Sequence, residues 1–565
     1  MKKLLVVTLC MMLALAVFAA CGGSDDPAPP PADTADTTDV ADDTADVADT
    51  TDVEDDTDAG EQAATGFDEP PTTVTVWFLG GQSDNDDTLV VEAANARLRE
   101  LGLNIELDPV WTGGWGMPEH AQIALDTGDS SIDVVFTSSW ALNFWNNARI
   151  GNFVRLDDPE NNLLERYGQD MMAELPQALW DAFTTDGPSG VGIYGVPGHK
   201  DYAALFAMDV NYARVTEILD YLGYEFSDLF DMGDDPDDER GGVNYHVFFT
   251  DLFEQVLETS KHLFGDDFFP MVPEPGNFLS HHTGSEGDVT GLGVFHTPMD
   301  PHNPALPTNP VFSLWLEDEL SISVLERLYD FWNRGFMDPR LAIPDEFDIG
   351  EAQNAGDYLF GTRQYAYGYT AQASEHRGFE VRFAPLAKPV VSSVSAVGSG
   401  FAVSVYSRNQ EAAVQFLNAW YTDNELAVIL TEGVEGVHWN YNDEGLIVLD
   451  ADARATYGTW RFGMGNIFAL SPRHTDGHGY FDRFRAYNEA GIPHALLGFS
   501  FDSEPVAMEM AALTAVVSEF NHTVSIGAVD PATGVPAYLE ALRANGVDRV
   551  MEELNAQAAA FLAAR

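Results

Sequence analysis

Between residues 74 and 136, apolar residues alternate between the spacing of a strand and the spacing of a helix. The pattern predicts strands over 74–79, 105–110 and 132–136, with helices over 87–101 and 118–127 between them. Successive strands joined by helices form a parallel sheet, because parallel neighbours need long crossover connections. We therefore expect an α/β domain built on a parallel sheet.

Polar and aromatic residues gather where these strands end. In parallel sheets, ligands bind beyond the carboxyl ends of the strands. Aromatic rings next to hydroxyl and amide groups suit a sugar, because its C–H faces stack on rings while its hydroxyls form hydrogen bonds. The residues at these three ends are Trp77, Gln82, Trp111, Trp115, Ser138 and Trp140.

The first 21 residues have the organisation of a bacterial secretion signal with a lipid attachment site. Two lysines precede an apolar run over 4–18, which has the length of a signal peptide and is short for a membrane span. Residues 18–21 read Phe-Ala-Ala-Cys and resemble a lipobox. This predicts a lipoprotein signal peptide over 1–20 and lipidation of Cys21, which would anchor the protein at the extracytoplasmic face of the cell membrane. The alternative is an ordinary secretory signal with Cys21 incidental.

Residues 21–71 are rich in Asp, Thr, Ala and Pro and predict an acidic disordered tether, because like charges repel and extend such a segment. The whole chain has 91 Asp and Glu against 27 Lys and Arg, a net charge of −64. A charge this negative repels phosphate backbones and argues against nucleic-acid binding.

The sequence gives little support for a cofactor or metal site. Cys10 and Cys21 are the only cysteines, so the rest of the chain has no disulfide, thiolate zinc site or catalytic cysteine. The spacing of glycines over 190–195 matches a dinucleotide motif, but Pro197 and Gly198 follow where a helix is needed. We expect no cofactor and no metal.

An ordered set of stretches resembles a known family. The set comprises IDVVFTSSW, GNFVRLDD and GIYGVPGHKDY, then a stretch over 399–439 ending in GVEGVHW, then LLGFSFDSEPVAMEMAALTAVVSEF. The chain is similar, over roughly 72–565, to the family-1 extracellular solute-binding proteins of bacterial ABC importers, and more narrowly to LipO-like lipoproteins. Its C-terminal stretch resembles the domain of unknown function that those lipoproteins carry. The insertion at about 231–310 fits this pattern least.

The resemblance implies an α/β fold of the two-lobed type II periplasmic-binding-protein class, a clamshell, with extra C-terminal helices. Lobe 1 is expected over 72–198 and 386–440, and lobe 2 over 199–385 and 441–565, including the C-terminal helical region. A ligand would be trapped between the lobes by hinge closure. The implied partners are the transmembrane subunits of an ABC permease, with the binding protein itself a monomer.

Strand ends and the expected crossings between lobes supply the candidate ligand-binding residues. For any single aromatic residue, a place in the core remains the alternative interpretation. The candidates are Trp77, Gln82, Ser138, Trp140, Lys200, Asp201, Tyr202, Tyr369, Glu435 and Trp439.

The sequence thus predicts a lipid-anchored substrate-binding component of an ABC importer, which captures a carbohydrate, an oligosaccharide, without acting as an enzyme. Strong negative charge makes a peptide or polyamine the alternative ligand. A further alternative is a cell-surface glycoside hydrolase, which would need two carboxylates about 5–10 Å apart. With 91 acidic residues, chance pairs of that kind are abundant. A surface protein that presents its ligand to a membrane receptor would share the same fold.

Overall fold

The computed structural model describes residues 67, 69–80, 87–111, 114–203, 205–231, 244–274, 289–298, 308–344, 346–365, 367–453 and 456–565. All of them belong to one compact unit, residues 64–565. The expected signal peptide, Cys21, nearly all of the expected tether and Gln82 lie outside the described residues, as do 232–243, 275–288 and 299–307 of the 231–310 insertion.

The first sheet contains the predicted parallel strands. β1 (Thr72–Trp77) pairs in parallel with β2 (Ile105–Val110) on one side and with β3 (Val134–Thr137) on the other. β14 (Gly400–Val403) and β6 (Val196–Pro197) add antiparallel neighbours, so the order is β2-β1-β3-β14-β6. The strand expected over 105–110 is confirmed at those bounds, and β1 ends two residues earlier than expected.

Helices cover this sheet, and their buried faces follow the sequence period. On α2 (Thr88–Glu100) the buried residues Val90, Ala94 and Leu98 are four apart, so they line one side of the helix. The other helices packed in this region are α3 (Met117–Asp126), α4 (Phe144–Ile150), α5 (Leu163–Tyr167), α6 (Gln169–Glu174), α7 (Gln177–Ala182), α15 (Ser393–Ala396), α16 (Gln410–Thr422) and α17 (Asn424–Glu432).

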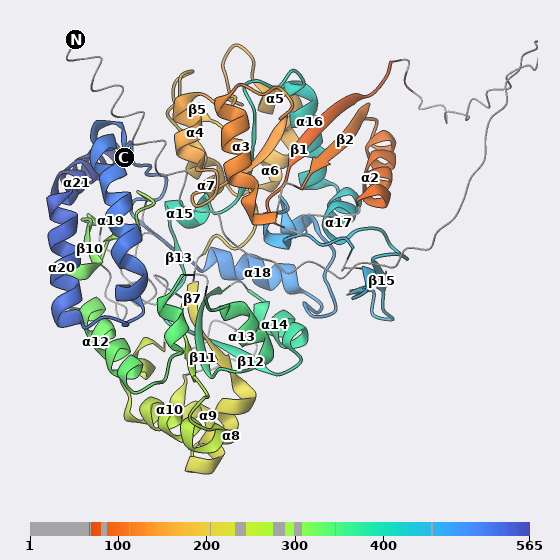
Figure 1. The fold of residues 1–565 in the computed structure, drawn as a ribbon. Coiled ribbons are helices and arrows are strands. Elements are labelled where there is room, and N and C mark those ends of the chain that lie inside the picture. Colours follow the sequence, from red (N-terminus) through yellow and green to blue (C-terminus); the bar gives the residue numbers. More distant parts are fainter. Residues whose placement is uncertain are drawn as a thin grey trace, which may run out of the picture. The chain divides into compact units, whose positions relative to one another are not determined.

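A second sheet lies in the lower part of Figure 1, in the order β12-β7-β11-β8. Its strands are β12 (Val381–Pro385), β7 (Leu205–Asn211), β11 (Phe360–Tyr365) and β8 (Met271–Val272). The helices around it are α8 (Tyr212–Leu222), α9 (Phe226–Leu229), α10 (Asp251–Phe264), α12 (Glu319–Asn333), α13 (Ile349–Ala355) and α14 (Tyr369–Arg377). The mixed α/β fold, whose two larger sheets are separate, agrees with the predicted fold class.

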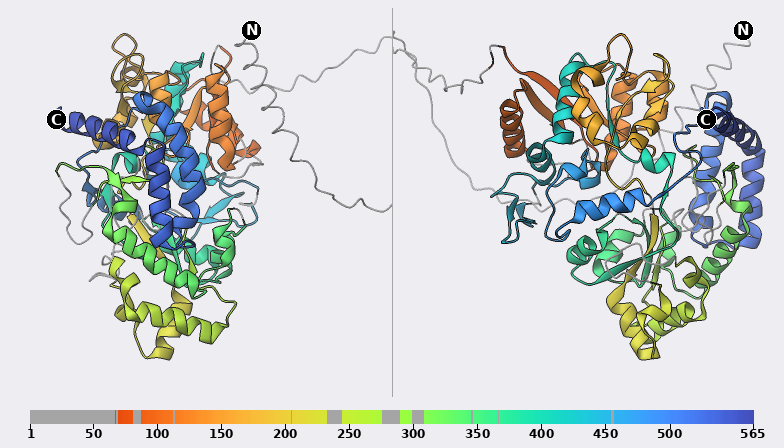
Figure 2. Two further views of the ribbon diagram at one scale, coloured as in Figure 1. Left: turned by 60° about the vertical axis from the view of Figure 1, so that its left-hand side comes forward. Right: turned by 180° about the vertical axis from the view of Figure 1, so that it is seen from behind.

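Three long C-terminal helices lie side by side next to α12 in Figures 1 and 2: α19 (Ala507–Ser525), α20 (Pro531–Ala544) and α21 (Val547–Ala563). Their buried residues, among them Leu513, Tyr538 and Leu554, join the hydrophobic cluster that also contains Met208 and Val210 of β7. A second hydrophobic cluster fills the region of the first sheet, and α18 (Tyr480–Glu489) contributes Tyr480, Phe484 and Tyr487 to it. The lobe boundaries stay a prediction.

A buried ion pair attaches α14 to the second sheet. Arg377 donates to Asp209 on β7 through both terminal nitrogens, at 3.0 and 2.9 Å, and the hydroxyl of Tyr358 donates to the same carboxylate at 2.7 Å. Both charged side chains are almost fully buried. Breaking a buried pair leaves an uncompensated charge, so this contact holds α14 in one position.

Candidate ligand-binding site

Three tryptophan side chains meet beyond the carboxyl ends of the parallel strands. Trp115 lies in η1 (Gly114–Gly116), which follows β2, and Trp140 lies in the turn that follows β3. Trp460, from a segment far along the chain, completes the group. The ring centres are 6.1 Å apart for Trp115 and Trp140, 5.3 Å for Trp115 and Trp460, and 5.9 Å for Trp140 and Trp460. We call this group the tryptophan cluster.

The cluster is open to solvent on part of its surface. Trp115 is 58% exposed and Trp140 is 54% exposed, while Trp460 is half-buried. Large aromatic side chains normally bury most of their area, and a group of exposed ones marks a surface for a ligand or partner. The three planes are tilted 44–74° to one another, so the cluster presents both ring faces and ring edges.

The turn after β3 fixes Trp140 through hydrogen bonds. The Ser138 hydroxyl oxygen accepts from the backbone N–H of Ala141 at 2.8 Å and from that of Trp140 at 3.3 Å. The indole Nε1 of Trp140 donates to the carbonyl oxygen of Gly398 at 2.9 Å, which ties the ring to the segment before β14. Ser138 itself is fully buried, so it shapes the turn and the exposed surface belongs to Trp140.

Trp460 sits against two glycines. A Cβ atom at Gly80 would lie 2.8 Å from Cβ of Trp460, and one at Gly463 would lie 2.5 Å from its ring. Gly80 also has φ +75°, which glycine adopts at little cost. The next residue, Arg461, is buried and donates to Asp476 at 2.9 Å. Burial acts to lower the pKa of Arg461, but the Asp476 and Glu432 carboxylates outweigh it and raise that pKa above its usual value.

A buried ion pair lies beside the segment that holds Trp140. Nζ of Lys200 donates to Asp201 at 2.9 Å, and both side chains are about 5% exposed. A Cβ atom at Gly398 would lie 3.3 Å from the same Nζ, so Lys200 lies close to the glycine whose carbonyl oxygen accepts from Trp140. Because Lys200 and Asp201 neutralise each other, they add no net charge next to the tryptophan cluster.

Comparisons with known proteins agree on one fold. The profile of a domain of unknown function, DUF3502, matches residues 495–563. A carbohydrate ABC transporter substrate-binding protein of Streptococcus pneumoniae serotype 4 is 21% identical over 520 residues, which covers 89% of this chain and 93% of the relative. The crystal structure of the N-glycan transport solute-binding protein NgtS from the same species superposes with a TM-score of 0.69 at 19% identity, covering 87% of this chain and 99% of NgtS. The chain has the fold of the ABC-transporter solute-binding proteins.

Another protein with the solute-binding-protein fold, from Bifidobacterium longum infantis, is described as an HMO-binding ABC-transporter-associated protein. It matches with a TM-score of 0.55 at 15% identity, over 87% of this chain and 99% of its own. The relatives are transporter substrate-binding proteins, a class without enzymatic activity. The resemblance expected from the sequence is therefore confirmed, including the position of the C-terminal domain of unknown function.

The other sequence candidates are spread over the solute-binding-protein fold. Trp77 is half-buried against the first-sheet core. Tyr369 begins α14, where Arg363 of β11 donates to its hydroxyl and lies over its ring. Glu435 and Trp439 line a groove of about 430 Å³ with Tyr441, but the Trp439 ring is only 4% exposed and its Nε1 donates to Gly433. Among the candidates, the structure places Trp140 in the tryptophan cluster and Ser138 and Lys200 next to it.

Tyr202 lies on a different surface. With His199 and Arg485 it lines a pocket of about 250 Å³ next to α18. Burial, helped by the positive charge of Arg485, lowers the pKa of His199 to about 3, and burial raises the pKa of Tyr202. Within the described part of the chain, Nδ1 of His199 has no hydrogen-bond partner.

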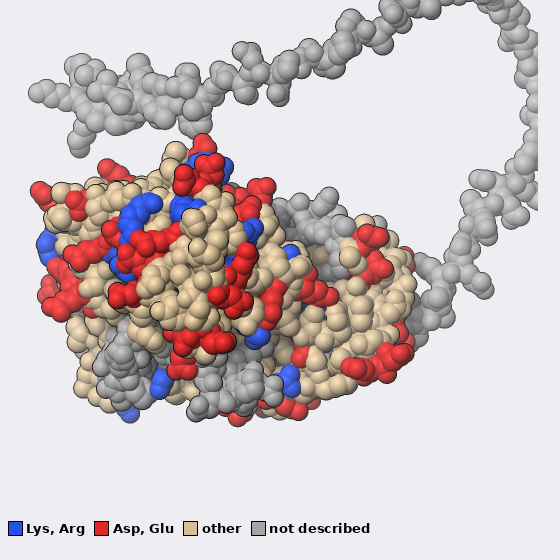
Figure 3. Space-filling view, turned by 90° about the horizontal axis from the view of Figure 1, so that it is seen from below, with Lys and Arg blue, Asp and Glu red and all other residues tan. Residues whose placement is uncertain are grey.

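Three further properties concern the surface charge, metal binding and membrane spanning. On the face shown in Figure 3, acidic side chains are scattered widely, which agrees with the net charge of −64. In the part of the chain that the structure describes, acidic, histidine and cysteine side chains do not form a group of three or more that would hold a metal ion. The same part of the chain contains no helix long and apolar enough to span a membrane.

Sequence reasoning did not include Trp460 among the candidate site residues. It belongs to an irregular segment with no periodicity, and only the three-dimensional fold brings it to the end of β3. Trp115 follows a recognised strand end and carried the same signal as Trp140, so it was within reach of the sequence.

Proposed function

We propose that this protein is the substrate-binding component of an ABC importer and that it captures an oligosaccharide at the tryptophan cluster. The observation that carries the proposal is the exposure of Trp115 and Trp140 beside Trp460, beyond the ends of three parallel strands. Sugar rings stack on such side chains through their C–H faces, while hydroxyls and carbonyls around the cluster bind the sugar hydroxyls.

The ligands named for proteins of the same fold support a carbohydrate. NgtS has been crystallised with Man1GlcNAc and with Man5GlcNAc, and another protein of this fold, FusA, with kestose. All three are oligosaccharides without acidic groups. A neutral ligand also suits this chain, because its net charge of −64 disfavours an acidic one.

Capture and release complete the proposed cycle. The ligand contacts both lobes and favours the closed arrangement, because it gains contacts there that the open arrangement lacks. We propose lobe 1 over 72–198 and 386–440 and lobe 2 over 199–385 and 441–565. The closed form then docks on the permease subunits. The sugar leaves unchanged, since no covalent step is involved, and the lipid on Cys21 keeps the protein at the extracytoplasmic face of the membrane.

A thermal-shift screen of the full chain tests the ligand class. The panel contains neutral oligosaccharides, monosaccharides, uronic-acid oligosaccharides, cationic peptides and polyamines. A ligand at 100 times its Kd stabilises a protein by about 2.7 kcal/mol, which raises the Tm by a degree or more. We expect a shift with neutral oligosaccharides. A shift with cationic peptides or polyamines alone would replace the carbohydrate with that class.

A further inference from the structure

The C-terminal domain of unknown function packs on the second-sheet side of the molecule. Leu496, Phe499 and Phe501 lie in the same hydrophobic cluster as β7 and the buried faces of α19–α21. Phe499 contacts Phe561 of α21 with ring centres 5.6 Å apart. The start of this domain is therefore part of the core around the second sheet.

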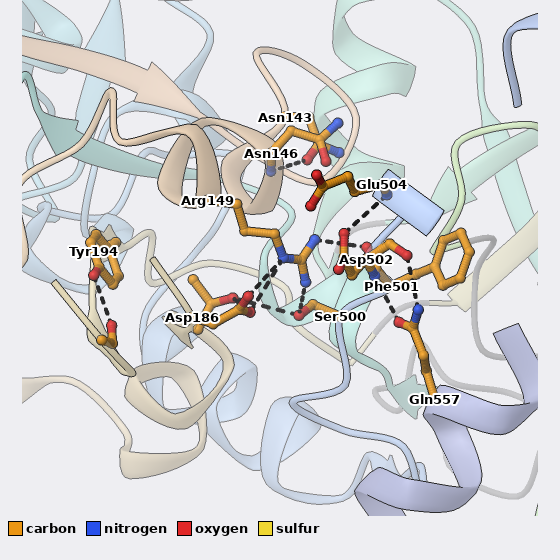
Figure 4. Close-up of polar contacts among 12 residues, drawn as sticks. Asn143, Asn146, Arg149, Asp186, Tyr194, Ser500, Phe501, Asp502, Glu504 and Gln557 are labelled. Atoms are coloured by element: carbon orange, nitrogen blue, oxygen red, sulfur yellow. Dashed lines mark hydrogen bonds and ion pairs between the residues drawn. The ribbon is translucent and has the colours of Figure 1, made fainter. Parts of the chain in front are cut away.

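The same segment is also held from the first-sheet side, by Arg149 near the end of α4. Its Nη1 donates to the carbonyl oxygen of Phe501 at 2.7 Å, and its Nη2 donates to the hydroxyl of Ser500 at 2.6 Å. Its Nε donates to Asp186, at 3.2 and 3.3 Å to the two carboxylate oxygens. Figure 4 shows the guanidinium bonded to Asp186, to the Ser500 hydroxyl and to the Phe501 carbonyl, so each of its three nitrogens donates a hydrogen bond.

Phe501 contacts both the second-sheet core and α4 of the first-sheet region. Its ring is buried in the second-sheet cluster, while its carbonyl is bound by a side chain from the first-sheet side. The following residue continues the connection, because Gln557 of α21 binds both the N–H and the carbonyl of Asp502 at 2.9 Å. A line of hydrogen bonds therefore runs from α4 through 500–502 to α21 (Figure 4).

The hydrogen bonds that Arg149 donates come from a charged group. Hydrogen bonds from a charged donor are shorter and stronger than neutral ones, and they strengthen further where water is excluded. The Arg149 side chain is 13% exposed, whereas Asp186 is 60% exposed. The hydrogen bonds to Ser500 and Phe501 are accordingly better shielded from water than the ion pair with Asp186. The ion pair orients the guanidinium.

We propose that the C-terminal domain is a brace between the lobes, anchored by Arg149, that favours the lobe arrangement in which this contact is formed. The inference rests on the two-lobed hinge of the proposed function, but it does not depend on what the ligand is. A hinge rotation that separates α4 from residues 500–501 must break hydrogen bonds from a charged donor. The brace therefore sets how often the ligand-free protein leaves this arrangement.

Distances between two spin labels test the brace without any sugar. Full-length protein would carry Cys10→Ser and Cys21→Ser, with labels at Ile123→Cys on α3 and Tyr221→Cys on α8, both more than 60% exposed. Double electron–electron resonance would give the distance distribution with and without Arg149→Ala. We expect the population at the distance of this structure to fall about tenfold relative to other distances, because the hydrogen bonds to Ser500 and Phe501 are both lost, at about threefold each.

Arg155→Ala is the matched control. Arg155 likewise binds one aspartate, Asp157 at 2.9 Å, and one backbone carbonyl, that of Ser189 at 2.8 Å, and neither lies in the C-terminal domain. Its distribution should equal that of the unsubstituted protein. If Arg149→Ala does not fold, Ser500→Ala removes one of the two contacts and should shift the distribution in the same direction by about threefold. The same distribution in the substituted and unsubstituted proteins would overturn the brace.

Discussion

The indole rings of Trp140 and Trp460 lie 5.9 Å apart, centre to centre, with their planes at 74°. One ring follows a strand of the parallel sheet and the other comes from an irregular segment after α17, so the contact exists only in the folded chain. The Nε1 of Trp140 is already bound to Gly398, which leaves the ring surface rather than its polar atom for a ligand. This geometry suits stacking on an apolar sugar face.

Removing a ring of the tryptophan cluster should weaken sugar binding without unfolding the protein. We expect Trp140→Ala and Trp115→Ala each to raise the Kd for an oligosaccharide by about tenfold or more, because central aromatic contacts dominate binding energy. Fluorescence titration measures the change. Tyr406→Ala is the control, since Tyr406 is 38% exposed and its ring lies near Gly128, just after α3, where a Cβ atom would be 3.4 Å from it. Equal affinities in all three variants would remove the cluster from the site.

Gly80→Ala should displace Trp460 and so change the geometry of the tryptophan cluster. The new Cβ would lie 2.8 Å from Cβ of Trp460, so the tryptophan must shift. Gly102→Ala is matched to it, because Gly102 has φ +78° and open space around its Cβ position. Both variants should lose about 1 kcal/mol to backbone strain. Only Gly80→Ala should also weaken sugar binding, by several-fold; equal binding in the two variants would mean that the Trp460 position is unimportant. Chemical denaturation and calorimetry provide the two measurements.

The buried pair of Arg377 and Asp209 should matter for stability far more than a surface pair. Arg377→Met leaves Asp209 buried and uncompensated, and we expect a loss of about 3–5 kcal/mol in the free energy of unfolding. Arg382→Met breaks the exposed pair with Glu380 and should cost less than about 1 kcal/mol. Chemical denaturation measures both. The double variant Arg377→Met/Asp209→Leu should regain much of the loss. A similar small cost for both single variants would contradict this account.

His199 should make the protein less stable in mild acid. Its pKa of about 3 in the folded protein lies below the usual value of 6.5, so below pH 6.5 the unfolded chain binds a proton that the folded one does not. The contribution of His199 to the free energy of unfolding is fully present above pH 6.5. It falls as the pH is lowered towards 3, by up to about 1.4 kcal/mol per pH unit. Replacement by glutamine should flatten the decline between pH 6.5 and 4. If stability declines with falling pH at the same slope in both proteins, the pKa of His199 is not lowered in the folded protein, and this prediction is wrong.

The first sheet was the part of the fold most open to sequence prediction. On α2, Val90, Ala94 and Leu98 repeat with the helical period, and on β3 a continuous apolar run marks a buried strand, so local pattern was sufficient. The place of β14 between β3 and β6 depends on pairing between residues far apart in the chain, which no local pattern specifies.

The site was predictable to the same extent and for the same reason. Trp140 follows a recognised strand, so its position at the sheet end could be expected. The position of Trp460 could not be expected, because Gly80 comes next to its side chain only in the folded protein, where Gly463 also packs against its ring. Trp439 shows the reverse case: a tryptophan at an expected crossing between lobes is a natural ligand candidate, yet it is buried and its Nε1 donates to the carbonyl oxygen of Gly433.

Calorimetric titration of the full chain with a neutral oligosaccharide, followed by mass spectrometry of the recovered sugar, tests the central claim most directly. The account predicts saturable binding of one sugar per chain, with the sugar recovered at its original mass. Recovery of shorter sugars would make the protein a glycoside hydrolase. No binding by any neutral oligosaccharide, in a sample that binds a cationic peptide or polyamine, would contradict the assignment of the tryptophan cluster to carbohydrate.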